Sequence, residues 1–463
     1  MGKSAQRSWL VVAVLVSGIV GVSLAACVGD APLVVVPGND AATVDAAVDV
    51  SDAGVTPDAP GDAATADAEA GPPPCGLDGG GALDLTYANG AKPQNVGPVF
   101  FELSAASMDP LGRVALVGRM RCTGGSTYDV TAYRLNADGT KDTSFGELDA
   151  GARRCVDLGD PEEWARAAAS DSSGGILIAT GTGLDQTQGR VIRLLPSGAR
   201  DLGYGVNGER AFPVGARIEA IHVDANNKLL VAYTNGGLGS LYRLAPDGSF
   251  DSSFGANGEV QLGTNQPFGV TATSTHVFVS GIDANGKAYV RRYTAAGSLD
   301  STFNGTGTGV TIDPPGDAGA LPMVGRAVVA RGARPTVLAL RTGNGGTPAL
   351  LGWAADGGAD PTFGSGGGVS LAPLVLGNDE TRNPLAVQTC DGKILAGAYE
   401  PGLVVKFVRF DATGTLDPTF GSSGVVGPSF FNSKPIAILS DGTHAILVAA
   451  TTGGNPLVAR INL

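Results

Sequence analysis

The sequence predicts an all-β protein, a closed ring of seven four-stranded antiparallel blades, which is a seven-bladed β-propeller. A short motif, Gly-x-x-Asp-x-x-(Phe or Tyr), recurs seven times, with its aromatic residues 49 to 60 positions apart. An apolar run and an Arg-bearing run precede most copies of the motif, and no segment has sustained helical periodicity. Units of four short strands that repeat at this spacing predict a β-propeller.

Residues 1–26 are predicted to form a signal peptide. Lys3 and Arg7 precede an apolar run at 9–23. This run is short for a membrane span and has the length of a signal-peptide core. An export signal at this end places the folded domain outside the cytoplasm.

The signal ends in Leu24-Ala25-Ala26-Cys27, which resembles the lipobox of bacterial lipoproteins. In that family the cysteine is lipidated and becomes the first residue of the mature chain. The resemblance implies lipidation of Cys27 and anchoring of the protein to a membrane of the cell envelope. Val28 stands where enterobacterial lipoproteins retained at the inner membrane have Asp, which favours the outer membrane. The alternative is an ordinary secretory signal with a chance cysteine.

Residues 27–74 comprise this cysteine and a predicted disordered tether. Beyond Cys27 the segment has nine acidic residues and no aromatic residue, Lys or Arg. It buries too little apolar surface to offset chain entropy. Of the net charge of −13, most lies in the tether. The acidic balance argues against a nucleic-acid partner, which would need a basic face.

Residues 75–463 are predicted to form the propeller, and the motif marks its blades. The Asp and aromatic residues of the seven copies are Asp84/Tyr87, Asp142/Phe145, Asp201/Tyr204, Asp251/Phe254, Asp300/Phe303, Asp360/Phe363 and Asp417/Phe420. An Arg lies five places before the motif Gly at Arg134, Arg193, Arg243, Arg292 and Arg409, whereas Gly352 takes this place in one copy.

We interpret these repeated residues as structural. An Asp in a Gly-rich turn accepts backbone N–H groups, and an Arg in the preceding strand can pair with it. The aromatic residue can fill the gap between neighbouring blades. The alternative is a calcium or catalytic role, but seven copies around a ring describe a scaffold, because a catalytic site is usually made once.

Each unit is read as four strands, in the order of the chain. One follows the aromatic residue, as at 424–426, and one precedes a tight turn, as at 385–388. The apolar run and the Arg-bearing run are the third and fourth strands. The Asp-Gly pairs at 391–392 and 441–442 predict hairpins. The chain ends on an Arg-bearing run, 456–463, and the motif missing there stands at the other end, so one blade is predicted to join both termini.

The run from Arg134 to Gly146 resembles the delta-60-type repeat of bacterial β-propeller proteins of unknown function. The resemblance covers about residues 78–463. It implies a propeller, and it implies no assigned activity.

Four cysteines remain if Cys27 is lipidated. The even number permits two disulfides in an exported protein. We favour a disulfide between Cys122 and Cys155, placed between adjacent blades. Cys75 and Cys390 are left either to pair with each other or to stay free.

No catalytic, cofactor or metal motif is visible in the sequence. His222, His276 and His444 fall in three different units. Two insertions outside the repeats are candidates for recognition loops. The alternative is that they are surface segments whose sequence has drifted because changes there are tolerated. They are the acidic segment 157–164, which ends on a Trp, and the long connection 313–322.

Three functions are compatible with this pattern. The first is a lipid-anchored binding or scaffold module, monomeric and not an enzyme, for an unidentified protein or glycan partner. The second is a hydrolase or lyase acting on polysaccharide, which would need carboxylates or histidines converging at the mouth of the central channel. The third is a purely structural envelope protein.

Overall fold

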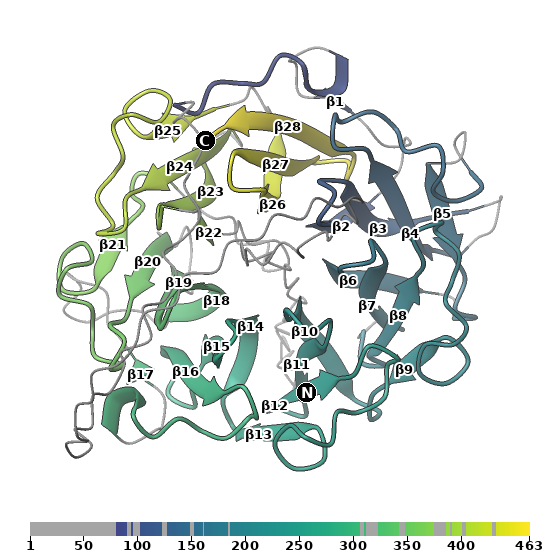
Figure 1. Ribbon diagram of the computed structural model, residues 1–463, viewed down its shortest axis with the longest axis horizontal. Coiled ribbons are helices and arrows are strands. Elements are labelled where there is room, and N and C mark those ends of the chain that lie inside the picture. Colours follow the sequence, from purple (N-terminus) through teal and green to yellow (C-terminus); the bar gives the residue numbers. More distant parts are fainter. Residues whose placement is uncertain are drawn as a thin grey trace, which may run out of the picture.

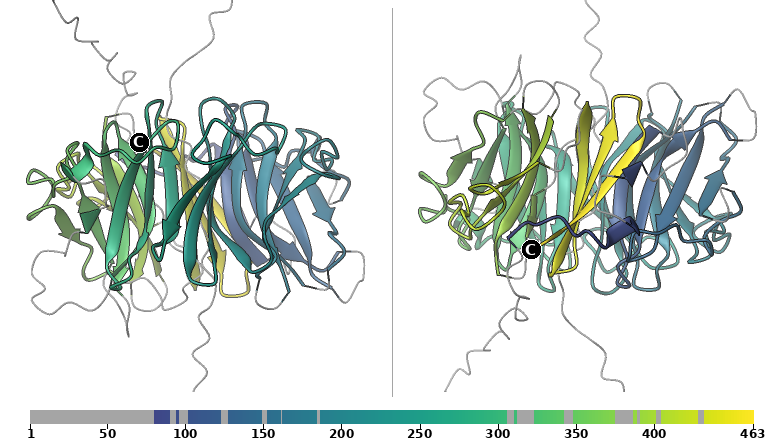
Figure 2. Two further views of the ribbon diagram at one scale, coloured as in Figure 1. Left: turned by 90° about the horizontal axis from the view of Figure 1, so that it is seen from below. Right: turned by 90° about the horizontal axis from the view of Figure 1, so that it is seen from above.

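The computed structural model is a ring of seven sheets around a central axis (Figure 1). The structure describes residues 80–89, 94–95, 102–122, 127–148, 152–160, 162–183, 186–305, 310–311, 323–341, 348–374, 386–388, 391–400, 404–427 and 432–463. Seen from the side, the ring is a disc whose strands run from one face to the other (Figure 2). No helix among the described residues is long and apolar enough to cross a membrane.

Each sheet has four antiparallel strands, which follow one another from the centre of the ring outward. Blade 1 comprises β2 (Glu102–Met108), β3 (Val114–Met120), β4 (Asp129–Leu135) and β5 (Arg153–Val156), and blade 2 comprises β6 (Glu163–Ser170), β7 (Ile176–Thr182), β8 (Arg190–Leu194) and β9 (Glu209–Ala211). Blade 3 comprises β10 (Ala216–Val223), β11 (Leu229–Asn235), β12 (Leu238–Leu244) and β13 (Glu259–Gly263), and blade 4 comprises β14 (Gln266–Ala272), β15 (His276–Ile282), β16 (Ala288–Thr294) and β17 (Val310–Thr311). Blade 5 comprises β18 (Met323–Arg331), β19 (Arg334–Arg341), β20 (Pro348–Gly352) and β21 (Gly368–Ser370), and blade 6 comprises β22 (Ala386–Gln388), β23 (Ile394–Glu400), β24 (Val404–Phe410) and β25 (Val425–Val426). Blade 7 comprises β26 (Ser433–Ser440), β27 (His444–Thr451), β28 (Pro456–Asn462) and β1 (Gln94–Asn95), and the two 3-10 turns are η1 (Tyr87–Asn89) and η2 (Phe303–Gly305).

Blade 7 joins the two ends of the chain, as the sequence predicts. Strand β1 pairs with β28, with Gln94 opposite Val458. An isolated bridge between Leu83 and Ile461 adds a second contact between the two ends. The seven-bladed, four-stranded antiparallel architecture is therefore confirmed, and the ring is closed by strands from both termini.

One detail of the predicted units is wrong. The strand that follows the motif, expected from the sequence to be the first strand of the next unit, is the outermost strand of the blade that it follows. Strand β25, for example, pairs with β24 of its own blade, with Val425 opposite Val408. The motif is thus a connection between two antiparallel neighbours, and each blade boundary lies one strand later than the sequence suggested.

The hydrophobic core lies between neighbouring blades. All seven residues of β3 are buried, because both faces of this strand are covered by adjacent elements. Val117 of blade 1 belongs to the same apolar cluster as Ile178 and Ile192 of blade 2. The blades therefore stabilise one another through burial of apolar surface at each junction.

The topology gives the disc two distinct faces. The hairpin turns between the first and second strands, such as 109–113, lie on the same face as the repeated motifs, and we call it the motif face. The chain passes from the outermost strand of one blade to the innermost strand of the next on the opposite face, as at 212–215. We call this the connection face.

Candidate functional site

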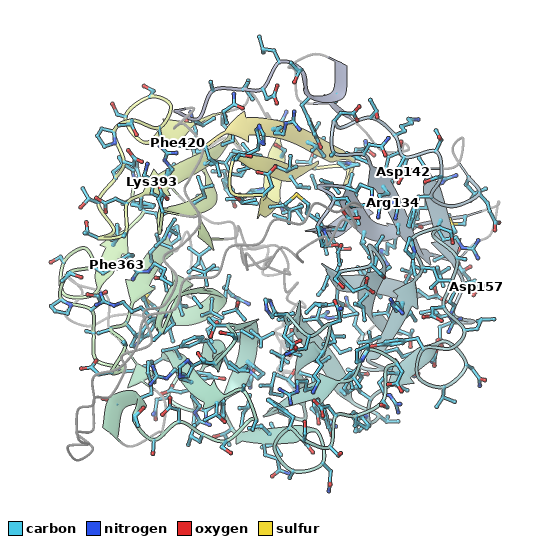
Figure 3. The ribbon with its side chains drawn as sticks, viewed as in Figure 1. Arg134, Asp142, Asp157, Phe363, Lys393 and Phe420 are labelled. Atoms are coloured by element: carbon cyan, nitrogen blue, oxygen red, sulfur yellow. A yellow bond between two sulfur atoms is a disulfide. The ribbon has the colours of Figure 1, made fainter. Side chains whose placement is uncertain are left out.

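The repeated Arg and Asp residues form ion pairs on the motif face. In blade 3, Arg243 Nε donates to Asp251 Oδ2 at 2.6 Å, and Oδ1 accepts the N–H and the hydroxyl of Ser253. The guanidinium also lies over the ring of Phe254. The same Nε–Oδ2 bond forms in Arg134–Asp142 (2.6 Å), Arg292–Asp300 (2.7 Å), Arg409–Asp417 (2.9 Å) and Arg460–Asp84 (2.7 Å). Figure 3 shows the Arg134–Asp142 pair in blade 1.

These contacts lower the pKa of six motif carboxyl groups, those of Asp84, Asp142, Asp251, Asp300, Asp360 and Asp417. Burial alone would raise the pKa of Asp84, but hydrogen bonds from Thr86 and Arg460 outweigh it and lower the pKa to about 2. The pKa of Asp251 is held well below its ordinary value: burial opposes the shift, and Lys228, Ser253 and Arg243 produce it. The carboxylates are therefore already paired with the chain's own cations.

The aromatic residue of each motif packs against the glycine of the next motif around the ring. Gly248 has φ of +81°, and a Cβ built there would lie 2.9 Å from the ring of Tyr204. Only glycine suits this conformation and this close approach. The other pairs are Gly81–Phe420, Gly139–Tyr87, Gly198–Phe145, Gly297–Phe254, Gly357–Phe303 and Gly414–Phe363.

A hydrogen bond accompanies each of these contacts. The residue after the aromatic donates its N–H to the carbonyl just before the next glycine, as Gly205 does to Asp247 at 2.7 Å. The closing joint uses the same bond, from Gly421 to Gly80 at 2.6 Å. The motifs thus form a continuous belt around the motif face, to which all seven motif aspartates and aromatics belong.

Blade 5 keeps the belt without an Arg at the repeat position. Gly352 stands there, and a Cβ on it would lie 2.6 Å from Phe363. Arg331, from the innermost strand, places its guanidinium over Phe363 and donates to the carbonyl of Ala412 in blade 6. Asp360 pairs with Arg334 at 3.3 Å and with Arg331 at 3.7 Å. In this blade the guanidinium beside the motif Asp and Phe therefore comes from β18, whereas the repeat position lies in β20.

Blade 2 departs from the pattern in a different way. Arg193 Nε donates to Asp171 at 2.9 Å, while Nη1 binds Asp201 at 3.1 Å. The residue before the second strand is Lys228 in blade 3, which reaches the motif Asp, but it is Gly175 in blade 2. A cavity of about 80 Å³ lies here, lined by Asp171, Ser173, Leu177, Arg193, Asn227 and Pro246.

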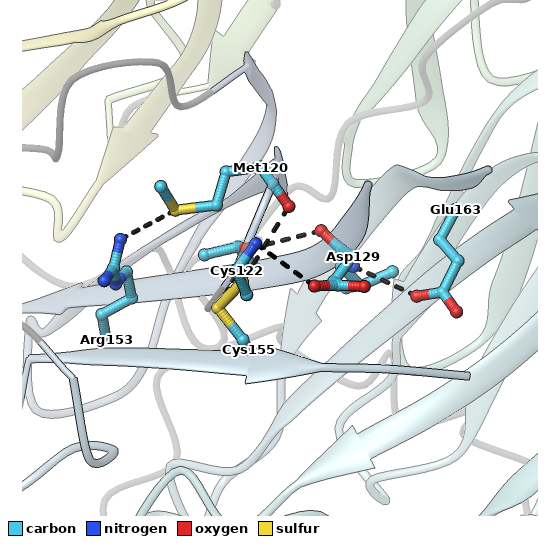
Figure 4. Close-up of a disulfide and its surroundings, with 8 residues drawn as sticks. Met120, Cys122, Asp129, Arg153, Cys155 and Glu163 are labelled. Atoms are coloured by element: carbon cyan, nitrogen blue, oxygen red, sulfur yellow. Dashed lines mark hydrogen bonds between the residues drawn. A yellow bond between two sulfur atoms is a disulfide. The ribbon is translucent and has the colours of Figure 1, made fainter. Parts of the chain in front are cut away.

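The connection face at the junction of blades 1 and 2 carries features that are not repeated. Cys122, after β3, is bonded to Cys155 of β5 (Figure 4). The predicted pair is therefore formed, but the prediction that it links adjacent blades is wrong, because β5 is the outermost strand of blade 1. Cys27, Cys75 and Cys390 lie outside the described residues, as does the insertion 313–322.

Arg119 of β3 contacts aromatic residues on both sides of this junction. Its guanidinium lies 3.2 Å from the ring centroid of Trp164 in blade 2 and 4.3 Å from that of Tyr128. It also donates to Glu102 and, at 3.1 Å, to Glu162. A cation stacked on two rings and paired with two carboxylates is rigidly placed. The predicted acidic loop 157–164 thus ends in this cluster.

Three carboxylates converge beside the disulfide. Ligand oxygens of Asp129, Asp157 and Glu163 all lie within 4.8 Å of one another. Glu163 is 0% exposed and accepts N–H groups from Leu158, Asp160 and Val130. Burial, reinforced by the charge of Asp157, raises the pKa of Glu163 to about 7. Burial also raises the pKa of Asp129.

Sequence reasoning missed most of this cluster. Asp157 lies in the predicted acidic loop, but Asp129 and Glu163 come from the starts of β4 and β6. The available signal was a Glu at the start of a run, 163–169, that is apolar apart from this Glu and Arg166. The histidines, as predicted, do not come together: His222 lies in β10 of blade 3, His276 lies 3.6 Å from Asp300 in blade 4, and His444 contacts Asp441 in blade 7.

Comparisons with known proteins identify the repeat. Residues 112–145, 225–254 and 391–420 match the sequence model described as a domain of unknown function (DUF5122) beta-propeller. Each match ends on the aromatic residue of a motif. No curated protein matches the chain.

Several solved structures are similar in fold. The streptogramin B lyase structure is 13% identical, with 82% of this chain and 97% of that chain covered and a TM-score of 0.45. The BP39L lectin from Burkholderia pseudomallei is 15% identical, with 78% and 96% covered and a TM-score of 0.44. The β-propeller domain of the Trilobed protease from Pyrococcus furiosus is 10% identical, with 79% and 94% covered and a TM-score of 0.44. Likenesses of this size say nothing about activity. The chain is a seven-bladed β-propeller in which three repeats match a propeller domain of unknown function.

Proposed function

We propose that the protein is an envelope-anchored binding or scaffold module whose contact surface is the blade 1–blade 2 junction of the connection face. The observation that supports this most is the division of roles between the two faces. The belt uses the repeated residues in its own contacts, whereas Arg119, Trp164 and Tyr128 form a cluster that is made once. Aromatic residues and arginines of this kind are enriched where proteins bind partners.

A photocrosslinking experiment tests the surface. A photoreactive amino acid replaces Arg121, which is exposed beside Tyr128, and in a control it replaces Leu111, which is 69% exposed on the motif face. We expect a covalent adduct with an envelope protein or glycan from position 121 and none from 111. An adduct only from 111, or from neither position, would contradict the proposed surface, and the second result would favour a purely structural role.

We propose further that Cys27 is lipidated and anchors the protein, favouring the outer membrane, with residues 28–74 as the tether. Supporting this are the order of basic residues, apolar run and lipobox in the sequence. The variant C27S should move the protein from the membrane fraction to the soluble fraction and abolish labelling by a fatty-acid analogue. The variant C75S is the matched control and should leave both unchanged. Retention of C27S in the membrane would overturn the anchor.

The hydrolase or lyase alternative receives no support from the acidic cluster. A catalytic carboxyl must touch its substrate. Glu163, whose raised pKa would suit a general acid, is 0% exposed and engaged by three backbone N–H groups. A polymeric substrate cannot reach it in this arrangement, so the binding role is the function we favour.

A further inference from the structure

We propose that Asp129, Asp157 and Glu163 bind one Ca²⁺ ion at the connection face, between blades 1 and 2. This inference goes beyond the binding role proposed above and does not depend on it. The three side chains come from the start of β4, from the loop after β5 and from the start of β6, so an ion held by all three would bridge two blades.

The first support is the lack of a compensating cation. The motif carboxylates pair with Arg or Lys, and the buried Glu219 pairs with Arg166 at 3.0 Å. Among the described residues no ion pair is recorded for Asp129, Asp157 or Glu163. Two arginines of this junction are engaged with other carboxylates: Arg119 with Glu102 and Glu162, and Arg190 with Asp160 and Glu209. Converging carboxylates without a partner charge repel one another.

The second support is an independent one, a buried hydroxyl without a hydrogen-bond partner. Thr182 of β7 lies directly opposite Glu163 of β6 in the sheet, so both side chains leave the same face, with Cβ atoms about 5 Å apart. Thr182 is 1% exposed, and its Oγ1 has no partner among the described residues. Buried hydroxyls are normally hydrogen-bonded, so this one indicates a missing partner beside Glu163.

The third support is the kind and spacing of the donors. All four side chains offer hard oxygen atoms, which Ca²⁺ prefers. Ca²⁺ holds oxygens at about 2.3–2.6 Å, so ligands on opposite sides of it lie about 4.6–5.2 Å apart. The carboxylate oxygens within 4.8 Å of one another can therefore contact one ion with little movement. Mg²⁺ requires about 2.0–2.1 Å, which would draw opposite ligands to about 4.2 Å.

The surroundings hold the carboxylates of Asp129 and Asp157 in place and leave one oxygen of each available to an ion. Backbone N–H groups hold Oδ2 of Asp129 and Oδ1 of Asp157, while Oδ1 of Asp129 and Oδ2 of Asp157 accept no hydrogen bond from the described residues. The Cys122–Cys155 disulfide lies beside Asp129, and Cys155 is two residues before Asp157. Figure 4 shows Asp129 between the disulfide and Glu163. Such preorganisation lowers the ordering cost of ion binding.

Calorimetric titration of the lipid-free mature chain carrying C27S, freed of metal with a chelator, tests the site. We expect one Ca²⁺ per chain and a melting temperature that rises with Ca²⁺ concentration, because an ion that binds only the folded state stabilises it. Mg²⁺ should bind more weakly. An absence of both heat and melting shift at millimolar Ca²⁺ would overturn the proposal.

Three variants separate a built site from general electrostatic attraction. D157N removes an exposed ligand and should fold normally while weakening Ca²⁺ affinity about tenfold or more. T182V keeps the charge and should also weaken affinity. D160N, an equal charge change three residues from Asp157, is the control and should alter affinity no more than about twofold to threefold. Equal weakening by D160N and D157N, or an unchanged affinity in both D157N and T182V, would refute the assigned ligands.

Discussion

Arg460, in the last strand of the chain, donates its Nε–H to Asp84, 376 residues earlier, at 2.7 Å. In blades 1, 3, 4 and 6 the same bond joins an Arg and an Asp only eight residues apart. The blade that closes the ring therefore has the same Arg–Asp bond as the blades formed within one stretch of chain. The guanidinium of Arg460 also lies over Tyr87 and donates to Ala137 of blade 1, which ties the closing blade to its neighbour.

Replacing a motif aspartate should destabilise the propeller. D251A leaves the guanidinium of Arg243 largely buried without its carboxylate, which costs about 3 kcal/mol of unfolding free energy. Denaturant unfolding should show the lower stability, and binding of any partner at the connection face should be unchanged. D247A is the control, since the exposed carboxylate of Asp247 accepts hydrogen bonds from Ser249, and its loss should cost about 1 kcal/mol or less. Equal stability of D251A and the parent would refute the structural role.

The close approach of glycine to the neighbouring aromatic ring should tolerate no side chain. G248A adds a methyl group 2.9 Å from Tyr204 at φ of +81°, so we expect backbone strain plus overpacking, together about 2–4 kcal/mol. G237A isolates the backbone term, because Gly237 has φ of +85° but nothing within 4 Å of the added Cβ. It should cost about 1–2 kcal/mol. Thermal melting of the two variants gives the difference, and a G248A no worse than G237A would contradict the ring contact.

The belt of blade 5 should depend on Arg331. This side chain is 8% exposed and contacts Asp360, Phe363 and Ala412, so R331A should cost about 3 kcal/mol. Arg334 also pairs with Asp360 but is 49% exposed, so R334A should cost less than about 1 kcal/mol. Chemical denaturation of both variants tests the assignment. A larger loss in R334A than in R331A would show that the exposed arginine is the main partner.

Stability should fall only in strong acid. The folded-state pKa of Asp84 is about 2, below its ordinary value of 3.8, and the pKa values of Asp142, Asp251, Asp300, Asp360 and Asp417 are lowered as well. Their stabilisation is therefore fully present above about pH 4 and is lost as the pH falls through the folded-state values. Melting temperatures measured between pH 7 and pH 2 should drop mainly below pH 4. A curve that stays flat down to pH 2 would show that these pairs contribute little.

The architecture could be predicted because its determinants are local and repeated. The Gly, Asp and aromatic residue of each motif stand at fixed spacing, so seven blades and their closure follow from counting. The pairing of β25 with β24 was not predictable by counting, because a period does not tell which neighbour a strand pairs with. The same error placed Cys155 in the wrong blade, although its partner was correct.

Most features that occur only once in the ring could not be predicted from the sequence. Arg331 replaces a missing repeat residue from another strand, which only the three-dimensional packing reveals. Asp129, Asp157 and Glu163 come from three segments with no common spacing, and they meet because blades 1 and 2 pack together. A search for repeated residues does not find such a site, because its residues do not recur.

The position of the chain's first described residues determines how mechanical load would enter the ring. Any pull on the chain before Gly80 meets the hydrogen bonds between Gly80 and Gly421 and between Gly81 and Asn462, and then the Asp84–Arg460 ion pair. The first contact joins the closing blade to blade 6, and the other two lie within the closing blade, so a pull would stretch them one after another. The contacts that complete the ring would therefore also resist a force applied to the chain before Gly80.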